Sequence, residues 1–279
     1  MTRSRMSDQK LLTEEAYADD RHLDVRYRTH QLYTLDPVDF VAWTLDRLSW
    51  CGDERVLDVG CGPGGLLGRL AGQGDAWGVL VGLDLSPGMV TKAVDSYARP
   101  AVCFLVGDAQ TLPFPDGAFD VVVAGHMLYH VPDIRGAVVE AARVLAPGGR
   151  FLATTNSAFT MSEYVALRSR AAARFPAMAG PDSASHRFSL ENGARFLEPD
   201  FDRVEVHRLP GVLRFPTAQP LVDYFASARS LYMRPGHTDA EWQAVLRFVQ
   251  AEAQAVIERE GHFDVTKVTG AVVAVKAEP

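Results

Sequence analysis

The sequence predicts an α/β fold in which a mainly parallel sheet is covered by helices on both faces. Short apolar runs alternate with helical stretches through the middle of the chain. The helical stretch that starts at Ile134 carries its apolar residues on one stripe and stops at Pro147-Gly148-Gly149, a strong terminator. Alternation of strand and helix is typical of parallel sheets, because each connection lays a helix against a face. The predicted strands are Val56–Val59, Val79–Leu85, Val102–Val106, Asp120–Ala124 and Arg150–Thr154.

The segments around this core are predicted to be mainly helical. Residues 1–12 are polar and are expected to form a flexible N-terminus. Residues 13–50 have a helical pattern that predicts an N-terminal lid. Residues 51–279 are expected to form the main domain, with helical cap insertions at about 158–190 and 216–261.

Local signals mark single elements in these flanking segments. Asp36 followed by Pro37 is a good helix start. Thr238 and Glu241 have the spacing of a capping box, which predicts the beginning of a late helix. The apolar residues of Phe201–Phe215 and Gly270–Val275 predict two further strands.

Composition argues against several classes of protein. There are 28 basic and 35 acidic residues, so the formal net charge of −7 argues against nucleic acid as a partner. The 3 cysteines lack C-x-x-C spacing and are expected to be reduced thiols. The first residues lack the apolar core of a secretory signal, and no apolar run reaches the length of a membrane span. We therefore expect a soluble cytoplasmic protein; its oligomeric state stays open.

A glycine-rich turn between the first predicted strand and the next helix predicts a ligand site. Gly60, Gly62 and Gly65 fit the G-x-G-x-x-G fingerprint of dinucleotide-binding proteins loosely, although glycine turns also form for packing reasons. Asp84 closes the next strand, where a carboxylate accepts hydrogen bonds from ribose hydroxyls. Asp84 could instead cap a helix, but Ser86 and the proline after it already supply that start. Together these residues favour a nucleoside-containing ligand.

The position of Asp58 indicates which nucleoside. Its carboxylate lies within the first strand, two residues before Gly60. A negative charge there is poorly placed beside a pyrophosphate, whereas it attracts an ammonium group at close range. An amino-acid-bearing nucleoside is therefore favoured over a dinucleotide.

Four motifs between Val56 and Phe151 then resemble a known family. They are VLDVGCGPGG, GLDLSPGMV, VGDAQTLPFPDGAFDVVVAGHMLYHVPD and RVLAPGGRF. In this order and spacing they resemble the core of class I S-adenosylmethionine-dependent methyltransferases, especially the branch with the ubiquinone- and menaquinone-biosynthesis C-methyltransferases. The resemblance implies a Rossmann-like seven-stranded sheet with the last strand antiparallel, so that Phe201–Phe215 and the final run form a hairpin-like pair. It also implies S-adenosyl-L-methionine as the cofactor.

The resemblance further implies which residues bind that cofactor. Asp58 would receive the methionyl ammonium, Asp84 would hold the ribose hydroxyls, and Asp108 would accept from the adenine amino group. The remaining residues would line the cofactor with backbone or apolar side chains: Gly60, Gly62 and Gly64 along the loop, Leu85 and Met89 on the adenine, Ala109 and Gln110 beside its ring, and Gly125 beside the methionyl part.

Two histidines after the fourth strand of the core are the candidate catalytic residues. His126 and His130 could act as general bases, because the ordinary pKa of histidine is near neutrality. Either could instead serve only to hydrogen-bond a loop. No metal is expected, because their segment is a strand end and loop and no third ligand is apparent. Gly125-His126-Met127-Leu128 also departs from the Asn/Asp-Pro-Pro pattern of the amide N-methyltransferases, which argues against exocyclic amino groups of bases as acceptors.

The aromatic and charged residues before the core are either the packed face of an amphipathic helix or a lid over the methionyl end. They recur at near-helical intervals: Tyr17, Arg21, Arg26, Tyr27, His30 and Tyr33. Tyr17, Tyr33 and Tyr129 are the candidate substrate contacts. We expect transfer of a methyl group to the oxygen, nitrogen or carbon of a small molecule. Two alternatives stay open: a cofactor-binding protein of the same fold that transfers no methyl group, and a tRNA-modifying methyltransferase.

Overall fold

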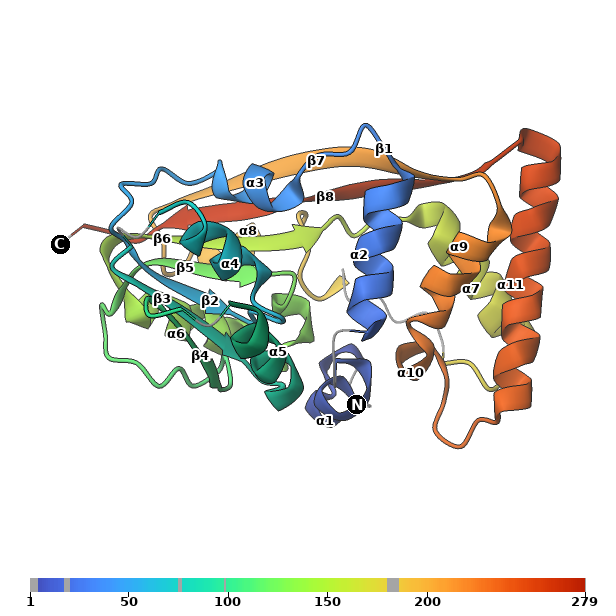
Figure 1. The fold of residues 1–279 in the computed structure, drawn as a ribbon, viewed down its shortest axis with the longest axis horizontal. Coiled ribbons are helices and arrows are strands. Elements are labelled where there is room, and N and C mark those ends of the chain that lie inside the picture. Colours follow the sequence, from blue (N-terminus) through green and yellow to red (C-terminus); the bar gives the residue numbers. More distant parts are fainter. Residues whose placement is uncertain (1–4, 18–20, 75–76, 98, 180–185, 279) are drawn as a thin grey trace.

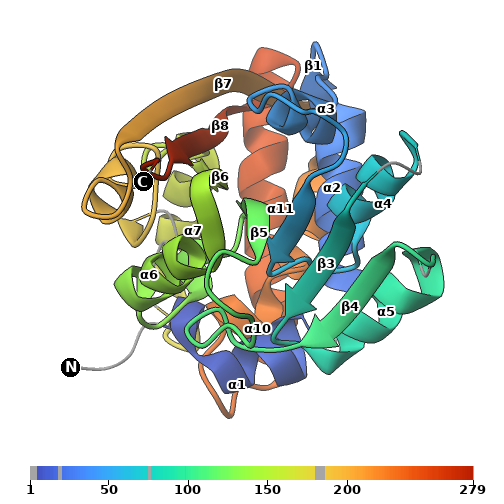
Figure 2. The ribbon, with the colours of Figure 1, turned by 90° about the vertical axis from the view of Figure 1, so that its left-hand side faces the viewer.

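The fold is built on one eight-stranded sheet. The computed structural model describes residues 5–17, 21–74, 77–97, 99–179 and 186–278. Within them the strands follow the order β1-β7-β8-β6-β5-β2-β3-β4 (Figures 1 and 2). The strands are β1 (Thr34–Leu35), β2 (Arg55–Val59), β3 (Val79–Asp84), β4 (Val102–Val106), β5 (Phe119–Gly125), β6 (Leu145–Asn156), β7 (Arg203–Phe215) and β8 (Phe263–Val275).

The directions of the strands confirm the predicted sheet with one addition. Strands β2 to β6 pair in parallel, and β8 is antiparallel to both neighbours, β6 and β7. The hairpin-like pair is also confirmed, since Arg203 pairs with Val275 and Phe215 with Phe263. The described sheet has one strand more than the seven predicted, because Thr34 and Leu35 extend beside β7 and pair with it. Two extended residues directly after a helix leave too short a pattern to be predicted.

Helices cover both faces of the sheet because each buried strand alternates its side chains between two cores. On β2, Leu57 and Val59 face α6 (Ile134–Val144) and α8 (Ala194–Leu197). Val56 faces the other core, which contains residues of α3 (Phe40–Leu45) and α4 (Gly65–Ala71). α5 (Pro87–Tyr97) contacts β3 and β4 beside α4 (Figure 2). α3 begins three residues after the predicted Asp36-Pro37 start, with Asp39 as its N-cap.

The cap has a core of its own beyond the carboxyl ends of the parallel strands. It consists of α2 (Arg21–Tyr33), α7 (Ser162–Arg174), α9 (Ala218–Ala226), α10 (Arg229–Tyr232) and α11 (Asp239–Glu260). Figure 1 shows β7 and β8 running past the other strands to reach it, and Phe215 and Phe263 at their joined ends are buried in it. The capping box of Thr238 and Glu241 at the start of α11 is confirmed. No helix in the described ranges is both long and apolar enough to cross a bilayer.

The N-terminal segment is packed where a flexible terminus was predicted. Arg5–Ser7 and Leu12–Ala16 form short irregular helices on either side of α1 (Gln9–Leu11). Met6, Leu11 and Leu12 are buried in the core of the cap. The few apolar side chains of the described residues 5–12 therefore find a partner far along the chain. Flexibility of this terminus stays a prediction, and residues 1–4 lie outside the described part.

Candidate functional site

Most of the predicted site residues lie where the parallel strands end. Asp58 lies in β2, Asp84 ends β3, and the loops after β4 and β5 carry Asp108 and His126. The backbone N–H groups of Gly60 and Cys61 donate to the carbonyl of Leu83, at 2.6 and 3.1 Å, and so tie the glycine loop to β3. Ligands of open α/β sheets bind at this edge.

The three glycines of the loop serve different purposes. Each has a positive φ, which favours glycine. A Cβ on Gly60 would lie 2.7 Å from Cγ of Met127, and a Cβ on Gly64 3.0 Å from Cβ of Ala93, so these two permit packing within the chain. A Cβ on Gly62 would meet no atom within 4 Å. Only at Gly62, of the three, does the backbone face open space in which a ligand can lie.

Asp58 is a buried carboxyl group without a hydrogen-bonding partner among the described residues. It is 3% exposed. Burial, and secondarily the charge of Asp84, raise the pKa of Asp58 to about 8. The neighbouring Asp84 differs, because it accepts from the N–H groups of Gly62 and Ser86, both at 2.8 Å. An unpartnered buried carboxylate is unfavourable, and a bound cation relieves it.

Asp108 is already contacted by the N-terminal segment. Its carboxylate accepts from the backbone N–H of Gln110 at 3.0 Å and from Nε2 of Gln9 at 2.9 Å. Hydrogen bonds of this kind hold the pKa of Asp108 below its ordinary value despite partial burial, which acts in the opposite direction. The side-chain amide of Gln9 thus lies where the sequence analysis expects an adenine amino group.

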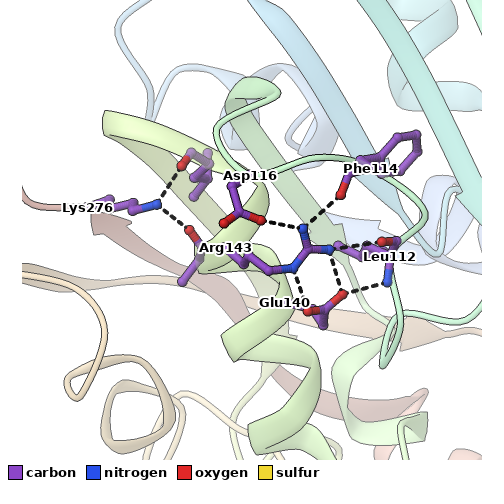
Figure 3. Close-up of polar contacts among 8 residues, drawn as sticks. Leu112, Phe114, Asp116, Glu140, Arg143 and Lys276 are labelled. Carbon is purple, nitrogen blue, oxygen red and sulfur yellow. Dashed lines mark hydrogen bonds and ion pairs between the residues drawn. The ribbon is translucent and has the colours of Figure 1, made fainter.

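A network around Arg143 fixes the loop that carries Asp108 (Figure 3). The guanidinium of Arg143 donates to the carbonyls of Leu112 and Phe114, at 2.9 and 2.8 Å. It also pairs with Glu140, whose carboxylate accepts from the N–H of Leu112 at 2.8 Å. Two charged side chains on α6 therefore hold the backbone just after the site, which limits the positions open to Asp108.

His130 connects the core to the N-terminal segment. Its Nδ1 lies 2.7 Å from the carbonyl of Met6, and its Nε2 lies 3.1 Å from the hydroxyl of Tyr17. Because a carbonyl only accepts, Nδ1 carries the proton and Nε2 accepts from Tyr17. Burial lowers the pKa of His130 to about 4. Both ring nitrogens are engaged, which supports the loop-holding interpretation over a role as base.

His126 keeps a ring nitrogen free of partners among the described residues. Its backbone is left-handed, with φ 52°, and its N–H donates to the carbonyl of Thr154 at 3.1 Å. Nε2 lies 3.4 Å from Oγ1 of Thr269, which itself donates to the carbonyl of Thr155 at 3.1 Å. Nε2 is therefore the donor and Nδ1 the basic nitrogen. Burial lowers the pKa of His126 to about 4, so the ring is neutral at pH 7.

The N-terminal segment lies over the strand ends. The carbonyl of Tyr17 accepts from Oγ of Ser86 at 2.8 Å, next to Asp84. Tyr27 of α2 is 57% exposed. Its remaining burial nevertheless raises its pKa, and Tyr17 and Asp58 make smaller contributions in the same direction. A side chain that is accessible and also close to Asp58 stands beside the site.

The other predicted residues are divided between site and core. Tyr129 stacks edge-on against His130, with ring centroids 4.6 Å apart, and is part of the site. Tyr33 is not, because its ring packs on Phe215 in the cap at 5.3 Å. Met89 and Ala109 are buried, while Leu85, Gln110 and Gly125 are partly exposed at the ends of their strands.

Sequence reasoning missed several residues that the fold brings to this edge. Gln9 gave no signal, because a polar residue in a short segment has no distinctive pattern. Lys267 and Thr269 could have been found, since they alternate on one face of the last strand and therefore point the same way. His30 contacts Lys267 on this face. Tyr224 of α9 packs against His30, and the centroids of the two rings are 5.8 Å apart. Within the described residues, no group of three metal-binding side chains is close enough to hold an ion.

Several known proteins with similar sequences are named as methyltransferases. Residues 57–153 match the methyltransferase domain family. The 27-O-demethylrifamycin SV methyltransferase of Amycolatopsis mediterranei is 41% identical over 101 residues, 35% of this chain and 36% of that protein. A ubiquinone/menaquinone biosynthesis C-methyltransferase of Methylobacterium nodulans is 33% identical over 153 residues, 52% of this chain and 60% of that protein.

The similarity in fold extends further than the similarity in sequence. The YcgJ protein of Bacillus subtilis superimposes with a TM-score of 0.58 and 19% identity, over 86% of this chain and 98% of that one. In sequence, the chain spans less than two thirds of either relative named above, at 36% and 60% of their lengths. The chain carries a methyltransferase domain of class I, the S-adenosylmethionine-dependent group, and it resembles the branch that contains the ubiquinone and menaquinone C-methyltransferases.

Proposed function

We propose that the chain transfers a methyl group from S-adenosylmethionine to a small-molecule acceptor. The observation that carries this proposal is the unpartnered Asp58 carboxyl beside the open face of Gly62. A carboxyl group with no hydrogen bond from its own chain suits the ammonium of the methionyl part. The backbone at Gly62 leaves room for the rest of the ligand.

Three carboxylates would hold the cofactor. Asp58 would pair with its ammonium. Asp84 accepts two backbone N–H groups and keeps further acceptor capacity for ribose hydroxyls. Asp108 would exchange the amide of Gln9 for the adenine amino group. When bound, S-adenosylmethionine supplies a methyl group attached to a positively charged sulfur. This sulfur is a good leaving group, because it becomes a neutral thioether when the methyl group is transferred.

His126 is the proposed general base. Its ring is neutral at pH 7, and Thr269 and the backbone contact with Thr154 fix its orientation. Nδ1 would take the proton that the acceptor loses as its new bond to carbon forms, a role that needs a neutral and oriented imidazole. His130 would act only as a positioning residue, because Met6 and Tyr17 occupy both of its nitrogens.

The cap and the N-terminal segment would enclose the acceptor. Tyr17, Tyr129 and the facing side of α2 surround the strand ends, and exclusion of water there favours transfer to a positioned nucleophile. Small-molecule acceptors also appear in the names of the rifamycin and quinone relatives. The net charge of −7 makes nucleic acid a poor acceptor, and a cytoplasmic location stays a prediction.

Calorimetry tests the proposal most directly. S-adenosylhomocysteine titrated into the protein should bind with an affinity in the micromolar range, and NADH should give no comparable heat. A flat titration at millimolar S-adenosylhomocysteine would refute the proposal. If the cofactor binds and is never demethylated while an acceptor is consumed, the protein is instead a cofactor-binding relative that transfers no methyl group.

A further inference from the structure

Two cationic side chains face the cap side of the site without a carboxylate partner. They are Arg26 of α2 and Lys267 of β8. The described residues place no Asp or Glu within ion-pairing distance of either one. By contrast, the exposed Arg214 pairs with a carboxylate, that of Asp264.

Lys267 is held by neutral groups only. Its Nζ donates to Oγ1 of Thr34 at 2.9 Å and lies 3.5 Å from Nδ1 of His30. Burial lowers the pKa of Lys267, and the charge of Lys267 in turn contributes to the low pKa of His30. Thr269, two residues further along the same face of β8, contacts the proposed base His126. The ammonium of Lys267 is thus on the strand face that carries the partner of the base.

Arg26 is likewise held by neutral groups. Its guanidinium donates to the hydroxyl of Tyr17 and to the carbonyl of Ser227, both at 3.4 Å, and to the carbonyl of His22 at 3.2 Å. The two contacts at 3.4 Å are long, so they leave most of the hydrogen-bonding capacity of the guanidinium for another acceptor. His30 lies one helical turn later and therefore on the same side of α2.

Aromatic rings lie near both cations. Tyr224 packs edge-on against His30, and the charge of Arg26 acts on Tyr224. Tyr129 also senses the charges of Arg26 and Tyr224. Planar apolar surfaces with a cation at each end fit a planar molecule that carries a negative charge. A partly buried cation without a counter-ion is unfavourable, and a bound anion relieves it.

We propose that the acceptor is a planar, largely apolar molecule with an anionic oxygen, a carboxylate or an ionised hydroxyl, bound by Lys267 and Arg26. This inference rests on the proposed function, because it assigns the substrate class of the same site. It also gives the two cations the role of orienting the acceptor towards His126. Neither side chain takes part in the transfer of the methyl group itself.

A pair of probes that differ only in charge tests this inference. 1-Naphthoate and 1-naphthamide have nearly the same shape, so calorimetry at saturating S-adenosylhomocysteine measures the effect of the charge alone. In the wild-type protein we expect naphthoate to bind about tenfold more tightly, ~1.4 kcal/mol. In Lys267→Met the ratio of the two affinities should fall to about one, and in Lys267→Arg it should be retained. Arg26→Met should reduce the ratio in the same direction.

The controls separate this inference from the proposed function. Lys92→Met, on the exposed side of α5, removes the same charge away from the site and should leave the ratio unchanged. S-adenosylhomocysteine should bind all variants alike, which also reports that they fold. Loss of that binding in the wild type would refute the proposed function. Normal cofactor binding with equal affinities for both probes, or with no uptake of millimolar naphthoate, would overturn the anionic acceptor alone. A preference that survives in both methionine variants would do the same.

Discussion

The hydroxyl of Tyr17 lies 3.1 Å from Nε2 of His130, 113 residues further along the chain. This hydrogen bond joins the segment before α2 to the loop after β5, and Arg26 donates to the same hydroxyl. The other ring nitrogen of His130 holds the carbonyl of Met6. One histidine therefore fixes two points of the N-terminal segment over the strand ends.

Removal of the Tyr17 hydroxyl should loosen this segment. In Tyr17→Phe, Nε2 of His130 loses its donor, and we expect a loss of about 1 kcal/mol in the free energy of unfolding. Hydrogen exchange of residues 5–17 should become faster. Tyr33→Phe is the matched control, because Tyr33 contacts the cap through its ring. Equal effects of both substitutions would show that the hydroxyl of Tyr17 holds nothing in place.

Cofactor binding should be linked to the ionisation of Asp58. Before binding, a pKa of about 8 keeps this carboxyl mostly protonated at pH 7. An ammonium beside it lowers the pKa, so a proton is released and affinity rises as the pH increases towards about 8. Titration of S-adenosylhomocysteine in buffers of different ionisation enthalpy measures that proton.

Asp58→Asn supplies the reference for this measurement. The ammonium of the ligand titrates in both proteins, so the difference between them isolates Asp58. The variant should bind at least about tenfold more weakly at pH 8, and its affinity should lose the rise that the wild type shows below pH 8. An identical pH dependence in both proteins would place the ammonium elsewhere.

Gly62→Ala should block the cofactor while the fold persists. The new Cβ meets no atom of the chain but occupies the open space beside the backbone, and the left-handed φ adds about 1 kcal/mol of strain. Gly236→Ala has a similarly positive φ and an equally open position in the loop before α11, so it carries the same strain without the block. Thermal unfolding should change alike in both variants, and only Gly62→Ala should lose S-adenosylhomocysteine binding. Normal binding of S-adenosylhomocysteine by Gly62→Ala would show that the ligand does not lie against this loop.

The protein should lose stability in mild acid because three partly buried histidines are neutral in the folded state. Burial holds the pKa of His30, His126 and His130 at about 4, below the ordinary value of 6.5. The folded state therefore binds fewer protons than the unfolded state in this window. The neutral histidines contribute their full stabilisation of the folded state above pH 6.5, and this contribution is lost as the pH falls towards 4.

Urea unfolding between pH 7.5 and 5 tests this pH dependence. His126→Asn is the informative variant, since asparagine tolerates the left-handed backbone found at this position. Its stability should fall less steeply with acid than that of the wild type. Asp58 acts in the opposite direction and is the same in both proteins, so the comparison isolates the histidine. Parallel curves would indicate that His126 is not buried as a neutral ring.

Much of the sheet and of the cofactor edge could be predicted from local pattern. The alternation of apolar runs and helical stripes marks β2 to β6, and the glycine loop with Asp58 and Asp84 marks the ligand side. The N-terminal half of the site could not be predicted in the same way. Tyr17 and Tyr33 share one near-helical spacing in the sequence. In the structure α2 begins only at Arg21, so they separate, one to His130 and one to Phe215.

Contacts between distant segments explain the remaining differences. The carbonyl of Met6 and the side-chain amide of Gln9 form hydrogen bonds with residues that lie 124 and 99 positions away in the sequence. The periodicity of apolar residues within a short stretch of sequence carries no information about such a contact. The choice between His126 and His130 as base depends on the same kind of contact, because the two residues have equal chemistry and differ only in what occupies their ring nitrogens.

The position of β8 has a consequence for synthesis on the ribosome. β8 follows β7 in the chain but lies between β7 and β6, pairing Asn156 with Thr269 and Phe215 with Phe263. A nascent chain that has produced β6 therefore keeps an open strand edge until residues 263–275 emerge. Open edges of this kind invite pairing with other chains. We therefore expect mispairing with other chains to be most frequent between the synthesis of β6 and that of β8, and slow translation of α11 to prolong this interval.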